Sequence, residues 1–564
     1  MKTLILLITV IKVFSSFVLS AENIHIDNLA QKVDSLVSLQ HNASEPGGVI
    51  GIVSRDGILY NNSYGLAHVE HKLENNENTL FDIASVAKQF TAFAILMLED
   101  EGKLSLDDDI RNYLPDVPAY EHKVTIRNLL QHTSGIPSTD VLRLFAGQSL
   151  DEKWTQEEEI ALIKRYPYLN FGPNSAHLYS NAGYSLLANI VESVSGLPFP
   201  GFMASRIFKP LGMNSSFIMD KEQSDVSNFA VGYKKEDEDF VEFSSLSDFS
   251  YGGGNIFTTL NDMVLWAKNI LSPTIDGNDF YQKISQPYNT LENGDTLFYT
   301  YGFYVRDHKG MKMVEHSGGV PGFRNQFMIF PGEDTIIILM FNNESINTRR
   351  LATGIAELLF ADKLIEEIPA QRVAIDFEIE DVRMFEGSYL MPDGMELSFV
   401  AEQDTFWLVL PGDQRFQLFA ESEHKFFLKA FDAQCTFVQS DDGTVNEMVW
   451  HQRGQDHSAV RVEEKVTLTP DDFPPYAGNY YHPELMSEYP IVFEDDKLQL
   501  YTPSNFEKYL GFDSVVLGHI NGDKFYAGWL GTLEFTRDED NQINGFVLLN
   551  VGRLQNIRFN LMAI

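Results

Sequence analysis

Cysteine is almost absent from this chain of 564 residues, which contains only Cys435. A single cysteine excludes an intrachain disulfide and is too few for a cysteine-rich zinc site or an iron–sulfur cluster. We expect Cys435 to be a small buried core residue. Thiol catalysis is also disfavoured, because Cys435 lies far along the chain from every candidate partner described below.

Basic residues are scarce as well, with 42 Lys and Arg against 80 Asp and Glu and a formal net charge of −38. Nucleic acid and anionic membranes are therefore excluded as main partners, because both require a basic face. Hydrophobic residues make up 44% of the chain and charged residues 22%, which is the balance of a globular protein with sizeable cores. At about 150 residues a domain, the length predicts roughly two to four domains.

Long hydrophobic runs are missing except near the start of the chain. Lys2 precedes the apolar stretch 4–8, and Val18 and Ser20 are small enough to flank a cleavage site before Ala21. Residues 1–20 are therefore predicted to be a secretory signal peptide. Lys12 interrupts the apolar run, so we expect no stable membrane insertion after cleavage. Export without disulfides favours a bacterial periplasm or the extracellular medium.

The first two thirds of the chain mix strand and helix signals. Residues 49–54 are apolar and β-branched, 55–57 form a turn, and the strand pattern resumes over 58–64, which predicts a hairpin. Residues 84–98 are almost continuously compatible with a helix. A second helix is predicted around 184–194, where apolar residues recur at helical spacing and Gly196 ends the segment.

Residues 311–342 switch to the two-residue period of strands. The pattern predicts strands at 311–315, 326–330 and 335–341, a glycine-rich loop at 318–322, and a closing helix at 352–365. If these strands pair with the hairpin at 49–64, the result is one antiparallel sheet backed by helices, an α+β domain.

After Pro369 clear helical periodicity disappears, and short aromatic and β-branched runs alternate with Asp, Asn and Gly. This composition predicts all-β structure. It also repeats, because the sequence at 385–389 resembles that at 476–480, 91 residues further on. We predict two β modules, each a small antiparallel barrel or sandwich. The predicted organisation is a signal peptide at 1–20, a first domain at 21–370, and β modules at 371–465 and 466–564.

The first candidate motif is Ser85-Val86-Ala87-Lys88. Residues three apart on a helix share a face, so the Lys88 amine lies one turn from the Ser85 hydroxyl. A serine needs such a base to become a nucleophile, and the helix N-terminus favours a developing oxyanion. The alternative is a helix-capping serine beside a solvated lysine. A second copy, Ser422 to Lys425, lies in the polar β region and is expected to have no function.

The second candidate is Tyr179-Ser180-Asn181. A tyrosine near cations can relay a proton, and an amide can hold a substrate carbonyl. The turn at 172–173 and the helix that follows can present these groups to a cleft. The same spacing at Tyr60 and Tyr168 is expected to represent ordinary strand and loop residues.

The third candidate is His316-Ser317-Gly318-Gly319, at the end of a predicted strand. Glycines there let a substrate backbone approach closely and can offer a free N–H. The alternative is a strand end with a hydrogen-bonded histidine.

The chain contains no HExxH and no GxSxG motif, and His68 and His71 are expected to be solvated surface residues. We expect no metal and no cofactor.

Five segments together resemble the class C β-lactamase and penicillin-binding-protein-like serine hydrolases. They occur in the family's order across residues 25–365: Phe81–Lys88, Leu129–Pro137, Tyr179–Asn181, Tyr251–Asp262, and His316–Gly318, where the family has Lys-Thr-Gly or His-x-Gly. The resemblance implies a β-lactamase/transpeptidase-like catalytic domain, with an antiparallel sheet flanked by helices. The two C-terminal β modules are similar to the two barrels of the D-aminopeptidase branch.

The resemblance also implies a role for each motif. Ser85 would be the acylated nucleophile, and Lys88 and Tyr179 would share the general-base and proton-return work. Asn181 would orient the substrate amide or ester. His316, Ser317 and Gly318 would line the substrate site, and the backbone N–H groups of Ser85 and Gly319 would form the oxyanion hole. His132 and Ser134, in the second segment, are expected to be structural.

His316 departs from the pattern of true β-lactamases and DD-peptidases, which usually carry lysine there. Histidine is mostly neutral near pH 7, so it holds a substrate carboxylate less well than a lysine does. We therefore predict a secreted serine hydrolase that acts through a Ser85 acyl-enzyme on small peptides, D-amino-acid amides, esters or β-lactams, with peptidase or esterase activity favoured. The alternatives are a β-lactamase or DD-carboxypeptidase, and a catalytically silent envelope protein that binds peptide or glycan.

Overall fold

The computed structural model describes residues 29–562 apart from 222–227, 244–247, 276–278, 287–288, 366–371, 392–394, 411–413, 441, 453–454 and 463–467. The predicted signal peptide at 1–20 lies outside the described residues. The described chain forms two compact units. Unit 1 holds the residues up to Thr139 and those from Asp151 to Ile365, and unit 2 holds Asp140–Leu150 and the residues from Arg372 onward.

The main sheet of unit 1 joins the two ends of that unit's sequence. Within the described residues it has six antiparallel strands: β12 (Tyr304–His308), β13 (Met311–Val320), β14 (Phe323–Phe330), β15 (Thr335–Phe341), β1 (Gly48–Ser54) and β2 (Gly57–Tyr64), in that order. The centre of the sheet pairs β1 with β15, placing Ile50 opposite Leu339. The predicted antiparallel sheet and its hairpin are confirmed.

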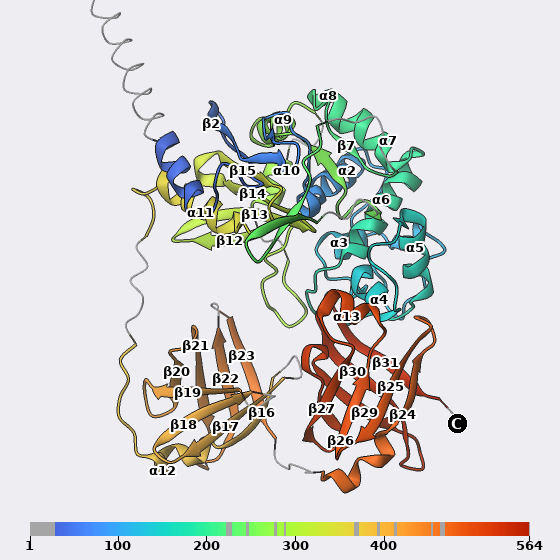
Figure 1. Ribbon diagram of the computed structural model, residues 1–564, viewed down its shortest axis with the longest axis vertical. Coiled ribbons are helices and arrows are strands. Elements are labelled where there is room, and N and C mark those ends of the chain that lie inside the picture. The colour runs from blue at the N-terminus through green and yellow to red at the C-terminus, as the bar shows by residue number, and fades with distance from the viewer. Residues whose placement is uncertain are drawn as a thin grey trace, which may run out of the picture. The chain divides into compact units, whose positions relative to one another are not determined.

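Helices cover both faces of this sheet, as Figure 1 shows. The helices and helical turns of unit 1 are one at 29–38, η1 (Ala84–Ala87), α2 (Lys88–Asp100), η2 (Ile110–Asn112), α3 (Ile126–Leu130), α5 (Gln156–Arg165), α6 (Asn181–Ser195), α7 (Phe199–Met203), η3 (Ala204–Phe208), α8 (Lys209–Leu211), α9 (Leu260–Leu271), α10 (Phe280–Ile284), η4 (Pro331–Glu333) and α11 (Thr348–Leu359). Shorter strands are β3 (Leu66–His68), β4 (Leu73–Glu74), β5 (Phe81–Asp82), β6 (Trp154–Thr155), β7 (Phe217–Ile218), β8 (Tyr233–Glu236), β9 (Asp239–Glu242), β10 (Asp248–Phe249) and β11 (Ile256–Thr258).

Strand alternation divides the apolar residues of unit 1 between two cores. On β15, Ile336 belongs to the core that contains α2, α6 and α9, whereas its neighbour Ile337 belongs to the core under 29–38 and α11. Successive strand residues point to opposite faces, so a fully apolar strand can serve both cores at once. This explains why β15 is buried at every position.

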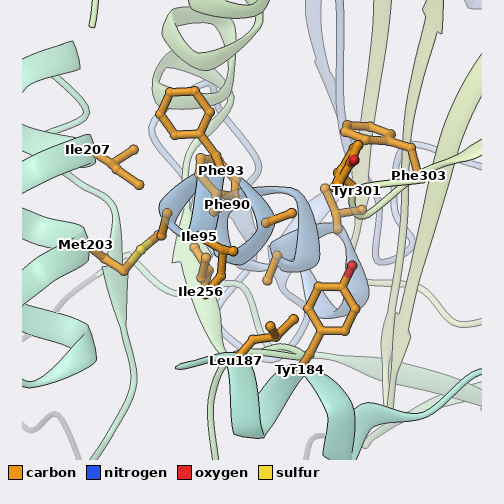
Figure 2. Close-up of a cluster of buried hydrophobic side chains, with 14 of the residues drawn as sticks. Phe90, Phe93, Ile95, Tyr184, Leu187, Met203, Ile207, Ile256, Tyr301 and Phe303 are labelled. Carbon is orange, nitrogen blue, oxygen red and sulfur yellow. The ribbon is translucent and has the colours of Figure 1, made fainter. Parts of the chain in front are cut away.

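The helix predicted at 84–98 is the centre of the larger core. It forms as a 3₁₀ turn, η1, followed by α2, and its residues from Lys88 to Leu98 are buried. Phe90 and Phe93 pack on Trp266 with ring centroids 4.3 and 5.2 Å apart. Figure 2 shows Tyr184 and Leu187 of α6 and Met203 and Ile207 among the labelled side chains of this core. A helix that is apolar all round is expected to be enclosed in this way.

The loop predicted at 318–322 is wrong, and the helix predicted at 352–365 begins earlier and ends at Leu359. The glycine-rich stretch 318–322 was predicted to be a loop, but β13 continues through Gly318 and Gly319 to Val320, and the turn follows at Pro321 and Gly322. Gly319 pairs with Arg324 in the ladder with β14. A Cβ on Gly318 would lie 2.3 Å from the Ile83 carbonyl oxygen, so the glycine is needed for close packing rather than for a turn.

Unit 2 contains two closed antiparallel barrels, which confirms the predicted β modules as barrels (Figure 1). Barrel 1 consists of β16 (Gly387–Leu390), β17 (Glu396–Glu402), β18 (Thr405–Leu410), β19 (Gln414–Ala420), β20 (Lys425–Leu428), β21 (Ala433–Gln439), β22 (Val445–Gln452) and β23 (Gln455–Arg461). Barrel 2 consists of β24 (Gly478–His482), β25 (Ser487–Glu494), β26 (Lys497–Tyr501), β27 (Ser514–Asn521), β28 (Lys524–Tyr526), β29 (Thr532–Arg537), β30 (Ile543–Val551) and β31 (Leu554–Leu561).

The repeated sequences occupy equivalent places in the two barrels. Tyr389 lies in the first strand of barrel 1 and Tyr480 in the first strand of barrel 2, and each hydroxyl donates to the carbonyl of the residue four positions earlier. Cys435 is fully buried in the core of barrel 1, as predicted, and burial raises the pKa of its thiol.

Helical segments also occur in unit 2, and those from residue 372 onward lie where only strands are predicted. They are α4 (Thr139–Phe145, from Asp140 onward), α12 (Ile379–Val382), η5 (Arg383–Phe385), η6 (Pro470–Asp472), η7 (Pro474–Tyr476), α13 (Asn505–Leu510) and η8 (Gly528–Leu530). They are too short to produce a helical period in the sequence. Over the described residues, no helix has both the length and the apolar character needed to cross a membrane.

Candidate active site

Ser85 lies on a strained turn between a strand and a helix. The chain leaves β5, and Ala84 adopts a φ of 48°, in the left-handed region that non-glycine residues rarely occupy. The Asp82 carboxylate accepts a hydrogen bond of 2.8 Å from the Ala84 N–H and so stabilises this conformation. Such strain is typical of functional sites, where the surrounding structure holds it.

Two side chains contact the Ser85 hydroxyl. Lys88 Nζ lies 3.2 Å from Ser85 Oγ, and the Tyr179 hydroxyl donates to the same oxygen over 2.8 Å. Lys88 and Ser85 are three residues apart along η1 and α2, as the sequence motif predicts, whereas Tyr179 comes from the loop before α6. Ser85 therefore has two neighbouring groups that can receive or return its proton.

Lys88 has no exposed surface. Besides Ser85, its ammonium group donates to Asn181 Oδ1 at 2.8 Å and to the Gly253 carbonyl at 2.7 Å, so all three of its protons can be bound. Its Nζ also lies over the Tyr179 ring, 4.8 Å from the centroid. The alternative of a solvated lysine is therefore wrong.

Asn181 is the first residue of α6, and its position is fixed from two sides. The Asn181 N–H donates to Ser138 Oγ over 3.1 Å, and Ser180 caps the helix by accepting from the Gly183 N–H. The family resemblance implies that Asn181 orients the substrate. The structure places its carbonyl oxygen on Lys88, so its side chain also orients the lysine.

His132 packs against the Tyr179 ring and binds the backbone of the next residue. Its Nδ1 accepts a hydrogen bond of 3.2 Å from the Ser180 N–H, and its ring centroid lies 4.3 Å from that of Tyr179. Ser134 lies in the same segment and accepts from the Ile136 N–H. Both residues therefore have the structural contacts expected of them.

The strand that carries the third motif passes directly beside η1. Gly318 packs against Ile83 and Val86, which brings the Gly319 backbone to the region of Ser85. β12 pairs with β13 only as far as Glu315, so in the described part of the sheet no strand covers this edge of 316–320. Ser317 and Gly319 are exposed there. An exposed strand edge offers backbone N–H and C=O groups to an extended ligand.

His316 is buried between two hydrogen-bond partners. Its Nδ1 lies 2.7 Å from the Ser317 carbonyl, which can only accept, so Nδ1 carries the proton. Its Nε2 is then an acceptor for the Tyr299 hydroxyl at 3.0 Å. Burial and the Lys88 charge lower the pKa of His316 to about 3. Both ring nitrogens of His316 therefore have hydrogen-bond partners within the protein, and the imidazole is neutral at pH 7.

Three groups that hold the site together could not be recognised from the sequence. Asp82 holds the nucleophile turn, the Gly253 carbonyl binds Lys88, and Tyr299 fixes His316. Asp82 and Gly253 lie inside two of the segments that resemble the family, but an aspartate or a glycine in a sequence does not by itself indicate such contacts. Among the described residues, no group of three or more His, Cys, Asp or Glu side chains is arranged to hold a metal ion.

This arrangement has the parts of an acyl-transfer site. Ser85 Oγ can attack a carbonyl carbon while Lys88 in its amine form, or Tyr179 as a phenolate, takes its proton. The first N–H groups of a helix lack intrahelical partners, so the Ser85 N–H at the start of η1 can stabilise an oxyanion together with the Gly319 N–H. Tyr179 is placed to return the proton to the leaving group.

Comparison with known proteins agrees with this geometry. Residues 29–361 match the family model described as Beta-lactamase. Penicillin-binding protein 4* of Bacillus subtilis is 29% identical over 429 residues, which cover 72% of this chain and 93% of that protein. A D-aminopeptidase of Cereibacter sphaeroides is 28% identical over 348 residues, or 61% of this chain and 64% of that protein.

Solved structures share the fold. The octameric penicillin-binding protein homologue from Pyrococcus abyssi superposes with a TM-score of 0.53 at 23% identity, covering 77% of this chain and 99% of that one. This similarity supports the predicted architecture of a β-lactamase/transpeptidase-like domain followed by two β-barrels.

The buried Asp82 carboxylate predicts a pH-dependent stability difference. Burial, with the nearby Asp248 charge, raises the pKa of Asp82 to about 7. An acid whose pKa is higher in the folded state stabilises the fold at low pH and loses that contribution as pH rises from about 4 to about 7. Asp82→Asn keeps a hydrogen-bond acceptor for Ala84 but cannot ionise. The stability of the variant relative to wild type should therefore increase by up to about 1.4 kcal/mol per pH unit over this range.

Urea unfolding of both proteins at several pH values from 4 to 8 measures this difference. Asp248→Asn removes the neighbouring charge but leaves the Asp82 carboxyl in place, and it should keep most of the pH dependence, because burial is the main cause of the raised Asp82 pKa. A difference between wild type and Asp82→Asn that does not change with pH would contradict the prediction.

Proposed function

Because this chain belongs to the beta-lactamase family of serine hydrolases, we propose that it cleaves an amide or ester bond through an acyl-enzyme on Ser85. The observation that carries the proposal is the contact of Ser85 Oγ with both Lys88 and Tyr179, at 3.2 and 2.8 Å. In the first step Ser85 Oγ bonds to the substrate carbonyl carbon while Lys88 as the neutral amine, or Tyr179 as the phenolate, takes its proton. The bond from that carbon to the leaving nitrogen or oxygen then breaks, and the leaving amine or alcohol receives the proton. Water then releases the acyl group by the reverse proton transfer.

The substrate class follows from the neutral His316. A cation at this place would attract a carboxylate next to the scissile bond, but both nitrogens of His316 already have partners within the protein. We therefore propose short peptides or amides of D-amino acids, or neutral esters, as substrates in preference to β-lactams. The similarity to a D-aminopeptidase supports the first of these classes.

We propose that the reaction takes place outside the cytoplasm, on the basis of the apolar segment at the start of the chain. The support is the pattern of Lys2, the apolar run and the small residues before Ala21. Expression of the full-length chain in a bacterium should yield an exported protein whose N-terminal sequence begins at or near Ala21. Recovery of an intact N-terminus from the cytoplasmic fraction alone would contradict this.

Replacement of the nucleophile tests the reaction class. Ser85→Ala should lower the hydrolysis of p-nitrophenyl acetate and of D-alanine p-nitroanilide by about a thousandfold or more, because removal of the nucleophile disables the unit formed with Lys88 and Tyr179. It should also abolish labelling by a fluorophosphonate probe. Ser422→Ala removes the exposed serine of the second S-x-x-K copy and should leave both rates and labelling unchanged.

If the Ser85→Ala variant hydrolyses both substrates at the wild-type rate and is labelled by the fluorophosphonate like wild type, the acyl-enzyme proposal is wrong. If wild type itself binds D-amino-acid peptides but is neither labelled nor active, the protein is a binding protein on the same fold.

Exchange of His316 tests the substrate class. His316→Lys places a cation at the edge of the strand and should raise the ratio of benzylpenicillin acylation to neutral-ester hydrolysis by about tenfold, since hydrogen bonds to charged groups contribute about 1.5–3 kcal/mol. His316→Gln is the neutral control, because its amide can replace both ring contacts. Equal ratios for the Lys and Gln variants would show that charge at this position does not select the substrate.

A further inference from the structure

An eleven-residue segment in the middle of the first domain's sequence belongs to unit 2. The segment Asp140–Leu150 includes most of α4, and its contacts are with barrel 2. Phe145 has no exposed surface. Its ring lies 5.9 Å from Tyr489, 5.4 Å from Phe506 and 6.5 Å from Phe559, measured between centroids. The segment is therefore anchored by an aromatic residue inside the core of barrel 2.

Polar side chains of barrel 2 bind the backbone of this segment. The buried Tyr489 hydroxyl donates to the Phe145 carbonyl over 3.0 Å. Asn505, at the start of α13, donates to the carbonyls of Leu144 and Gln148 at 2.9 and 3.0 Å. These carbonyls lie at and just beyond the end of α4, where a helix leaves its last carbonyls without intrahelical partners.

The C-terminal half of the segment is held in the same way. The Leu150 N–H donates to the Tyr509 hydroxyl over 2.8 Å, and Ser149 Oγ lies 3.1 Å from that hydroxyl. At the other end, the Arg553 guanidinium lies 3.2 Å from the Asp140 carboxylate. Contacts along the whole segment thus determine its conformation, although it has no long regular structure of its own.

Within unit 1, the chain just before and just after the segment binds one buried carboxylate, that of Glu159. Thr139 Oγ1, just before the segment, donates to Glu159 Oε1, and Trp154 Nε1, just after it, donates to Glu159 Oε2 at 2.9 Å. Glu159 Oε1 also accepts from Ser185 Oγ, in the second turn of α6, at 3.1 Å. Glu159 therefore connects Thr139 and Trp154, the flanking residues in unit 1, to the helix that begins with Asn181.

The residue before Thr139 contacts the candidate active site directly. Ser138 Oγ accepts from the Asn181 N–H at 3.1 Å, and Asn181 Oδ1 accepts from Lys88. The position of the first turn of α6 therefore depends on Ser138 and Thr139. These two residues continue without a break into the segment that barrel 2 holds.

We propose that barrel 2 is a positioning module for the catalytic site, with Tyr489 and Asn505 as positioning residues. By fixing 140–150 they restrict Ser138 and Thr139, and so they keep Asn181 and Lys88 in the geometry that activates Ser85. An unanchored segment of this length would sample many conformations, and its ends would hold α6 less firmly. This inference rests on the proposed function, because it concerns the rate of the reaction at Ser85.

A matched pair of tyrosine variants tests the proposal. Tyr489→Phe and Tyr480→Phe each remove one buried hydroxyl from barrel 2 that donates to a backbone carbonyl, but only the carbonyl bound by Tyr489 belongs to the segment. One such hydrogen bond corresponds to a factor of about two to ten. We expect Tyr489→Phe to slow acylation of Ser85 by p-nitrophenyl acetate, and labelling of Ser85 by a fluorophosphonate, by this factor. It should lower kcat for a neutral ester with little change in KM. Tyr480→Phe should leave both rates unchanged.

A larger perturbation within the segment provides the second measurement. Phe145→Ala removes the aromatic anchor and should slow acylation more strongly than Tyr489→Phe, with faster hydrogen exchange of the amides of 140–150 and of the first turn of α6. Phe145→Leu should restore most of the rate. Should Phe145→Ala fail to fold, the tyrosine pair still decides the question.

The proposal is overturned if Tyr489→Phe and Tyr480→Phe slow acylation equally, because the effect is then a general loss of barrel stability. It is also overturned if neither Tyr489→Phe nor folded Phe145→Ala changes the acylation rate. Both outcomes leave Ser85-dependent hydrolysis intact in wild type. Failure of the proposed function would instead appear as activity that survives Ser85→Ala.

Discussion

The complete burial of the Lys88 ammonium is the constraint on which the rest of the catalytic region depends. A cation removed from water is costly unless each of its protons meets an acceptor. The acceptors here come from three separate parts of the chain: Ser85 one turn earlier, Asn181 at the start of α6, and the Gly253 carbonyl. These elements must meet for the fold to be stable, and their meeting assembles the site.

The same environment has the opposite effect on His316. Desolvation opposes the charge on both residues, but Lys88 has acceptors for all its protons, whereas His316 faces one acceptor carbonyl, one tyrosine hydroxyl and the charge of Lys88 itself. The histidine therefore remains neutral beside a cation. A site with one fixed positive group, directed at the nucleophile, suits proton transfer at Ser85 better than it suits the capture of an anionic substrate.

Periodicity and motif spacing predicted much of this structure. The hairpin at 49–64, the strand at 335–341 and the helix ending at Gly196 follow from local patterns, and the S-x-x-K spacing places Lys88 beside Ser85. Contacts that depend on tertiary packing were not predictable in this way. The extension of β13 through Gly318 follows from the proximity of Ile83, and the partner of His316 is Tyr299, in a loop without a motif. The repeat correctly indicated two similar barrels, because the equivalent tyrosines of their first strands make the same hydrogen bond.

The segment 140–150 shows why a functional domain and a compact unit of the fold need not have the same boundaries. Leu142, Leu144 and Phe145 are buried, but no helical or strand period in the surrounding sequence indicates which core they enter. Their partners lie more than three hundred residues further along the chain, in a barrel without a catalytic motif. Thr139 and Trp154, which flank the segment, both bind Glu159, and Glu159 also binds Ser185 of α6. The backbone connection through 140–150 can therefore make the conformation of the site depend on how firmly barrel 2 holds the segment. In such an arrangement a barrel contributes to catalysis by restricting a backbone segment, without placing any of its own side chains at the reacting atoms.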